Sequence, residues 1–114
     1  MTDNAGVTHR KVDDIFILEL PARLDAASGA EANRWVEWGL ADSPGVVVVD
    51  FTRTTEADAA GLEAFKFLFA RAAEVDIEVG FAALGAGLKP QMEAAGYLKR
   101  AKAFDTVDEA IAEM

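Results

Sequence analysis

Hydrophobic residues follow two different spacings along this chain of 114 residues. Residues 14–20, DIFILEL, alternate in the period of two that is typical of a strand with one face more buried than the other. Residues 43–51, SPGVVVVDF, join a turn to a run of valines, which predicts a central strand buried on both faces. Residues 77–84 predict another strand, and a short one ends at Phe104.

Between these strands, apolar residues recur at the spacing of amphipathic helices. Residues 27–41 and 59–75 each gather their large apolar side chains on one helical face. Trp38 falls at the edge of the first of these faces, where we expect it to border the core. Since a valine-rich strand must be covered on both faces, both helices are expected to pack on the sheet.

The C-terminal third predicts two shorter helices. Residues 88–97 should form one that stops at Gly96, and Asp105 or Thr106 should cap the last one. The order is therefore β-α-β-α-β-α-(β)-α, in which short connections imply a largely parallel sheet with right-handed crossovers. We expect an α/β fold with a central sheet of four to five strands and about four helices.

Composition narrows the picture to one domain. Hydrophobic residues make up 52% of the chain, which favours a compact fold. Residues 1–12 are polar and predict a flexible N-terminal tail that contains His9, followed by a single domain over 13–114. With no cysteine and one histidine, neither zinc chemistry nor a Ser-His-Asp triad is expected. We expect no metal and no cofactor.

Charge and hydropathy limit the partners. A net charge of −9 makes nucleic acid an unfavourable partner, because phosphate binding depends on Lys and Arg, and a basic protein surface fits better. The N-terminus lacks the apolar core of a signal peptide, and no apolar run approaches the ~20 residues that span a bilayer. The sequence predicts a soluble, cytoplasmic protein without direct membrane insertion.

Four segments stand in a distinctive order. They are ELPARLDAASGAE at 19–31, GVVVVDF at 45–51, DAAGLEAF at 58–65 and the run from VGFAAL to DEAI at 79–111. In order and spacing they resemble the STAS domain of bacterial anti-sigma factor antagonists and sulfate transporters. The resemblance covers nearly the whole chain after the tail and implies a STAS-like fold.

The third segment carries the motif that the resemblance makes most informative. In the antagonists, D-x-x-G-L usually reads Asp-Ser-Ser-Gly-Leu or Asp-Ser-Thr-Gly-Leu, and an anti-sigma kinase phosphorylates the second hydroxyl residue, which breaks the complex. The matching residues here are Asp58, Ala59, Ala60, Gly61 and Leu62. Alanine has no oxygen to accept phosphate, so we expect no phosphorylation at Ala60.

The resemblance implies a partner-binding surface around this motif. Thr54 and Thr55 are the nearest upstream hydroxyls, but phosphorylation of that loop would be a different switch. Phe67 is either an exposed partner contact or a rim residue covered by the neighbouring helix. The expected partner-binding residues are Asp25, Thr54, Thr55, Glu56, Asp58, Ala59, Ala60, Gly61, Leu62 and Phe67.

Several of these residues also have a purely structural interpretation. Asp58 can cap the helix that follows it, and Asp25 can cap the helix that begins near Ala27. Gly85 and Gly87 precede a helix and could bind an anion, but without the full phosphate-loop pattern a plain loop is the simpler interpretation.

The resulting hypothesis is a non-enzymatic regulatory module that binds a protein, such as an anti-sigma factor or a related kinase-like regulator. The alternative is a STAS-like accessory or small-ligand-binding subunit of a transport or lipid-trafficking assembly. An enzyme is disfavoured because no nucleophile, base and oxyanion site converge in the sequence. A weak homodimer is compatible with either hypothesis.

Overall fold

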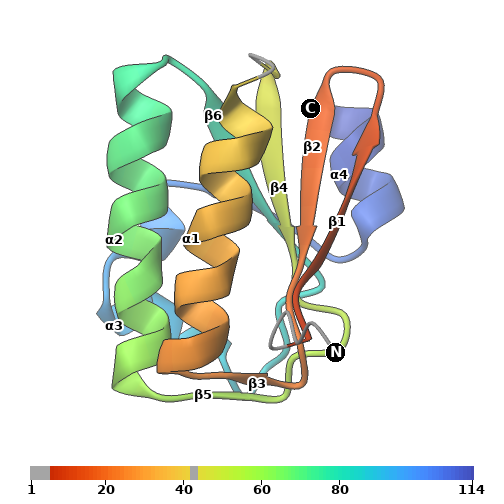
Figure 1. Ribbon diagram of the computed structural model, residues 1–114. Helices are drawn as coiled ribbons and strands as arrows, with labels where there is room; N and C mark the ends of the chain where they lie inside the picture. The colour runs from red at the N-terminus through yellow and green to blue at the C-terminus, as the bar shows by residue number, and fades with distance from the viewer. Residues whose placement is uncertain (1–5, 42–43) are drawn as a thin grey trace.

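The computed structural model, which describes residues 6–41 and 44–114, contains a five-stranded sheet with helices on both faces (Figure 1). The strand order is β1-β2-β4-β6-β7; β1 is antiparallel to β2, and the other neighbours are parallel. The predicted α/β class and mostly parallel sheet are thus confirmed. The strands span Thr8–Val12 (β1), Ile15–Glu19 (β2), Val46–Asp50 (β4), Glu78–Ala82 (β6) and Lys102–Phe104 (β7).

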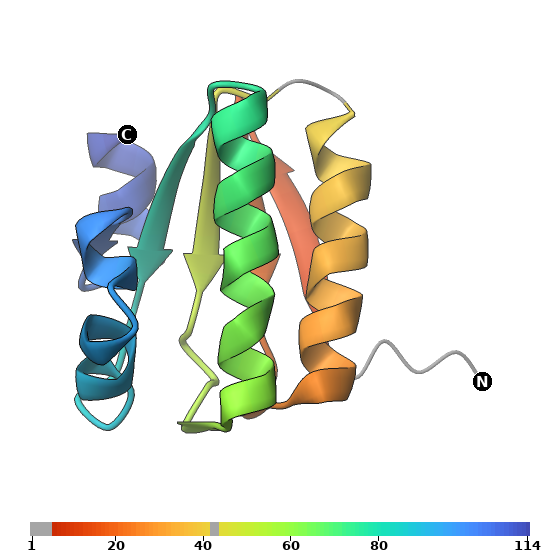
Figure 2. The same cartoon turned by 90° about the vertical axis from the view of Figure 1, so that its left-hand side faces the viewer.

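Two long helices cover one face of this sheet and a short one covers the other. The helices α1 and α2 lie side by side on one face, and α4 lies on the opposite face (Figures 1 and 2). A short helix, α3, contributes Met92 to the same core as α1 and α2. The helices span Ala26–Leu40 (α1), Ala59–Glu74 (α2), Lys89–Ala94 (α3) and Val107–Glu113 (α4).

The sheet therefore separates two hydrophobic clusters. Alternate residues of β2 point to opposite faces, so Phe16 and Leu18 join the large cluster under α1 and α2, while Ile15 and Ile17 join the smaller one under α4. All four side chains are buried. The face of Phe16, Leu18 and Leu20 is more buried than the other, as the pattern predicted, because Glu19 is only half-buried. The second face is nevertheless covered by α4 at Ile15 and Ile17.

Part of the predicted flexible tail, residues 1–12, forms an edge strand of the sheet. The prediction is wrong for residues 8–12, which form β1 and pair with β2 from Thr8 opposite Glu19 to Val12 opposite Ile15. Val7 is fully buried. His9, also assigned to the tail, packs its ring 4.2 Å from that of Trp35. Residues 1–5 lie outside the described part of the chain.

The C-terminal elements follow their local signals, except that α3 ends at Ala94, two residues before the predicted stop at Gly96. Gly96 adopts a left-handed backbone with φ of 81°, between Ala95, the C-cap of α3, and a 3-10 turn, η1, at Tyr97–Lys99. Thr106 caps α4 by accepting a hydrogen bond from the Glu109 amide at 3.0 Å. Within residues 6–41 and 44–114, no helix combines the length and the hydropathy required to cross a bilayer.

Candidate functional site

A second, very short sheet joins the segment that precedes α1 to the segment that precedes α2. β3 (Arg23–Leu24) pairs in parallel with β5 (Glu56–Ala57) at the edge of the molecule where α1 and α2 both begin (Figure 1). The Asp58 amide also donates to the Leu24 carbonyl at 3.1 Å. The sequence patterns did not predict these strands, since each is two residues long. Their pairing sets the N-termini of the two long helices next to one another.

The aspartates that follow these strands are both helix caps. Asp25 accepts a hydrogen bond from the Ser28 amide at 3.1 Å, while the Ser28 hydroxyl accepts one from the Asp25 amide at 2.8 Å. Asp58 accepts one from the Gly61 amide at 2.8 Å. The structural interpretation of both residues is thus correct. Each carboxylate is engaged by its own helix.

The capping hydrogen bonds lower the pKa of Asp25. Hydrogen bonds from the Ser28 amide and hydroxyl, with a smaller effect of the Arg23 charge, lower the pKa of this carboxyl below its usual 3.8. Because the folded pKa is depressed, the cap stabilises the fold fully above the unfolded value and is lost as the pH falls through the folded pKa.

The stability lost on Asp25→Ala should therefore depend on pH. We expect the difference in unfolding free energy between wild type and variant to be constant near neutral pH. It should shrink as the pH falls below 3.8, because protonation removes the capping acceptor from the wild type as well. Urea unfolding between pH 7 and pH 2.5 measures it. A difference that stayed constant across this range would contradict the capping role.

The two threonines in the preceding loop have different environments. Thr54 is 5% exposed, and its hydroxyl donates to the Pro21 carbonyl at 2.8 Å. Thr55 is exposed, and its hydroxyl donates to the Ala22 carbonyl at 3.3 Å. Thr54 thus holds the loop in place. Because its side chain is buried, it is not accessible for direct contact with a partner. Only Thr55 of this pair presents its side chain at the surface.

The first turn of α2 combines exposed and buried positions. Ala59 and Ala60 are exposed, whereas Gly61 is buried and packs against the backbone of Leu24. Leu62 is half-buried, and its carbonyl accepts a hydrogen bond from the Tyr97 hydroxyl at 2.8 Å. We call the exposed positions here the α2 N-terminal surface; its members are Thr55, Glu56, Asp58, Ala59 and Ala60.

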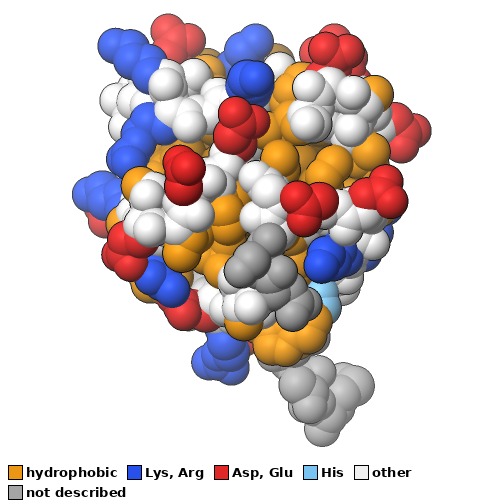
Figure 3. Space-filling view, turned by 90° about the horizontal axis from the view of Figure 1, so that it is seen from above, with side chains coloured by type: hydrophobic (Ala, Val, Ile, Leu, Met, Phe, Trp, Pro, Cys, Tyr) orange, Lys and Arg blue, Asp and Glu red, His pale blue; other side chains and the backbone are white. Residues whose placement is uncertain are grey.

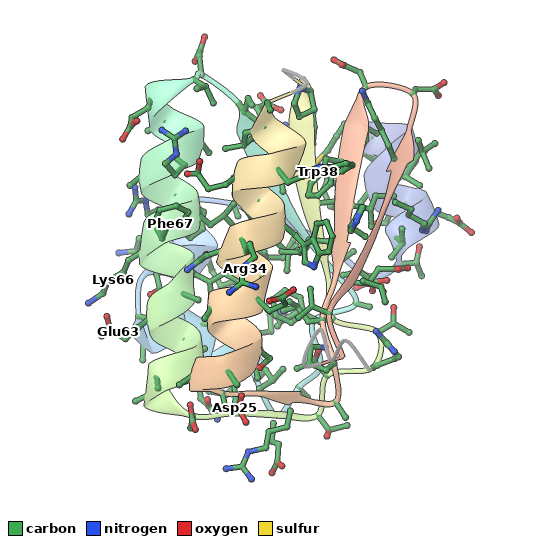
Figure 4. All side chains as sticks on the ribbon, in the orientation of Figure 1. Asp25, Arg34, Trp38, Glu63, Lys66 and Phe67 are labelled. Atoms are coloured by element: carbon green, nitrogen blue, oxygen red, sulfur yellow. The ribbon has the colours of Figure 1, made fainter. Side chains whose placement is uncertain are left out.

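Phe67 extends this surface along the helix. It is 37% exposed and labelled on the outer side of α2 in Figure 4. It lies seven residues after Ala60, or nearly two full turns, so the two side chains share one helical face. Glu63 lies between them on the same face and is also exposed. The aromatic ring is thus continuous with the α2 N-terminal surface.

A second exposed aromatic side chain lies on α1. Trp38 was expected to border the core, but 56% of its surface is exposed. It packs edge-on against Trp35, with ring centroids 5.7 Å apart, and its centroid lies 4.8 Å from that of His9. The sequence pattern did not predict this cluster, because the polar residues around His9 indicated a tail.

The exposed side chains around the start of α2 are small, apolar or acidic. Within the part of the chain that the structure describes, no three His, Cys, Asp or Glu side chains gather in a way that could hold a metal ion. The Gly85 carbonyl accepts hydrogen bonds from the Leu88 and Lys89 amides, at 3.1 and 3.0 Å, which makes this segment a closed turn. The exposed alanines and Phe67 are apolar, and the exposed carboxylate of Glu63 lies between Ala60 and Phe67 on the same helical face.

Comparison with known proteins identifies the fold. The family model described as the STAS domain matches residues 7–110. Among curated proteins, nothing matches. An anti-sigma factor antagonist from Mycobacterium paratuberculosis has a similar structure, with a TM-score of 0.79 at 17% identity over 93% of this chain and 90% of that one. Unphosphorylated SpoIIAA, an anti-sigma factor antagonist known from Bacillus, gives 0.73 at 12% identity, covering 94% of each chain.

Transporter proteins share the same fold. A sulfate transporter family protein from Wolinella succinogenes gives a TM-score of 0.70 at 17% identity, over 87% of this chain and 83% of that one. At these sequence identities the similarity shows a shared fold only. It does not assign the functions of these proteins to this chain.

Proposed function

Because this chain belongs to the STAS domain family, we propose that it is a non-enzymatic regulatory module that binds a protein partner in the manner of an anti-sigma factor antagonist. The observation that carries this proposal is the exposed face of α2 from Ala60 to Phe67, which begins beside the paired strands β3 and β5. Aromatic side chains such as Phe are enriched at protein interfaces relative to the rest of the surface. The partner is then an anti-sigma factor or a related kinase-like regulator.

We propose further that this surface is not switched by phosphorylation at the family's usual position. A phosphate on the first turn of a helix faces free amides and the positive end of the helix dipole. It would add about −1.5 to −2 charges to the contact surface. Ala60 can carry no such group, so the module binds constitutively or is controlled through its expression or another subunit.

A charge at position 60 should therefore reproduce what phosphorylation does in the family. We expect Ala60→Asp to weaken partner binding by about tenfold or more, since the new carboxylate must be desolvated at the centre of the contact. Affinity capture from lysate of the native cells, with bound proteins identified by mass spectrometry, finds the partner. Titration calorimetry with the purified partner then measures the loss.

Two further variants sharpen this test. Ala112→Asp makes the same change at an exposed position of α4, on the opposite face of the sheet, and should bind like wild type. Phe67→Ala should weaken binding if the ring is a contact. Equal binding by wild type and Ala60→Asp would refute the proposed surface. Stoichiometric phosphorylation within residues 54–60 by the cognate kinase would refute the absence of a switch.

The second candidate function is an accessory role in a transport or lipid-trafficking assembly. It is favoured by the shared fold with the Wolinella succinogenes sulfate transporter family protein. The same capture experiment separates the two candidates. An anti-sigma protein lost on Ala60→Asp supports the regulatory module, whereas membrane-transport subunits support the accessory role.

A further inference from the structure

An open pocket of about 370 Å³ lies at the other end of α2 from Ala60, beside the edge of the sheet formed by β7. Four segments form its walls: the C-terminal half of α2, residues 77–79 at the start of β6, the turn from η1 into β7, and Met114 after α4. Pockets that hold small ligands start at about this volume. The lining residues are Phe69, Ala72, Ala73, Ile77, Glu78, Val79, Lys99, Arg100, Ala101, Lys102 and Met114.

The floor of this pocket is apolar. Phe69, Ala72 and Val79 belong to the large core under α1 and α2, and each exposes only a small part of its surface. Ile77 and Met114 are half-buried and extend the apolar wall. A hydrocarbon group bound here would be removed from water and would contact apolar side chains of the core, which is favourable.

The rim is basic. Lys99, Arg100 and Lys102 are all exposed, and Glu78 is the one acidic residue of the lining. None of the three cations forms an ion pair with another described residue, and no described side chain or carbonyl accepts a hydrogen bond from them. Among the described lining residues, three cationic side chains stand against one acidic side chain, so the side-chain charge of this pocket is positive.

Arg100 is already positioned for a ligand. Its guanidinium carbon lies 4.8 Å from the centroid of the Phe69 ring, so the aromatic face holds the cation over the pocket floor. The planar guanidinium keeps its N–H donors free for a carboxylate or phosphate, which it can bind with two parallel hydrogen bonds.

This positive rim contrasts with the net charge of the chain, which is −9. Among the described residues, five of the eleven basic side chains are in ion pairs and six are not; the paired ones are Arg10, Arg23, Arg34, Lys66 and Arg71. The three at the pocket are free of such partners among the described residues. Figure 3 shows basic side chains gathered along the upper left margin of the face seen from above, next to exposed hydrophobic atoms.

We propose that this pocket binds a small amphiphilic anion: a carboxylate or phosphate monoester that carries a short hydrocarbon chain. Arg100 and the two lysines bind the headgroup, and the floor formed by Phe69, Ala72 and Val79 takes the chain. This site is separate from the α2 N-terminal surface and does not depend on the proposed regulatory function. It adds a small-molecule ligand to a module otherwise described by its protein contacts.

The test uses the full chain and simple probes. Decanoate and decyl phosphate represent the two headgroups, while decanol lacks the charge and inorganic phosphate lacks the chain. We follow backbone amide shifts by NMR as each probe is added. Decanoate or decyl phosphate should shift the amides of Ala72, Val79 and Ala101, and whichever binds more tightly identifies the headgroup. Decanol and inorganic phosphate should bind at least about tenfold more weakly, since each keeps only half of the interactions.

Matched variants locate the binding. Arg100→Glu should weaken binding of the better anion by about fivefold or more, because it replaces an attraction with a repulsion. Lys11→Glu makes a similar change of charge on β1, away from the pocket, and should alter affinity less than twofold. Ala73→Trp fills the pocket from an exposed position without disturbing the core, and should abolish binding.

Three outcomes would overturn the proposal. Shifts that do not centre on the lining residues place the ligand elsewhere. Equal affinity for decanol and decanoate would show that the negative charge does not contribute to binding. Equal affinity for inorganic phosphate and decyl phosphate would show that the hydrocarbon chain does not contribute. Failure of Ala60→Asp to affect protein binding would leave these results unchanged, so the two proposals fail independently.

Discussion

Replacing Phe81 with alanine should destabilise the fold by about 3–5 kcal/mol, a large part of the roughly 5–15 kcal/mol that holds a domain of this size together. The Phe81 side chain, near the C-terminal end of β6, is fully buried. Its ring centroid lies 5.4 Å from that of Phe51, 5.6 Å from that of Phe65 and 5.9 Å from that of Phe69. Alanine would leave a cavity that these rings cannot fill without moving the sheet or α2.

Urea unfolding followed by circular dichroism measures this loss. Phe67→Ala is the matched control, because it removes the same atoms from a side chain that is 37% exposed on the outside of α2. We expect Phe67→Ala to cost about 1 kcal/mol or less, since less apolar surface returns to water. If the two variants lost similar stability, Phe81 would not be the centre of the aromatic core.

Replacing Gly61 with alanine should cost about 3 kcal/mol, near the upper end of what overpacking usually costs. A β-carbon at this position would lie 2.3 Å from the carbonyl oxygen of Leu24 and 2.9 Å from the amide nitrogen of Asp25. Both atoms belong to the backbone, so no side-chain rotation relieves the clash. The substitution should push β3 away from α2 and weaken the surface on which the proposed partner docks.

Gly85→Ala is the control for this variant. A β-carbon at Gly85 would meet no atom within 4 Å, so we expect no loss of stability. A small gain, of up to about 1 kcal/mol, would follow from the reduced entropy of the unfolded chain. Thermal or urea unfolding compares the two variants directly. If both were as stable as wild type, the close approach of α2 to β3 would not constrain position 61.

Gly61 also shows how far sequence reasoning reaches at this site. The motif D-x-x-G-L identified the glycine, but the pattern contains no reason for it. The structure supplies one: the backbone of the first turn of α2 passes directly against the backbone at Leu24. Two helix caps, at Asp25 and Asp58, were predicted correctly because capping depends on residues within one turn.

The elements that the patterns missed share a property. β1 carries polar residues such as Arg10 and Lys11 because it lies at the edge of the sheet with much of its surface in water. Its strand structure comes from pairing with β2, a contact between segments and not a property of either alone. β3 and β5 are shorter still and exist only because their loops meet.

By itself, the sequence determined the α/β layering and the absence of a hydroxyl at position 60. Periodicity and residue identity are local, so they can be read without a structure. Only the tertiary structure decided that Thr54 is buried while Thr55 is exposed, and that Lys99, Arg100 and Lys102 surround an apolar floor. These features depend on which segments, distant in sequence, are in contact in the folded chain. Those contacts are set by close packing of the whole core and cannot be derived from any one segment.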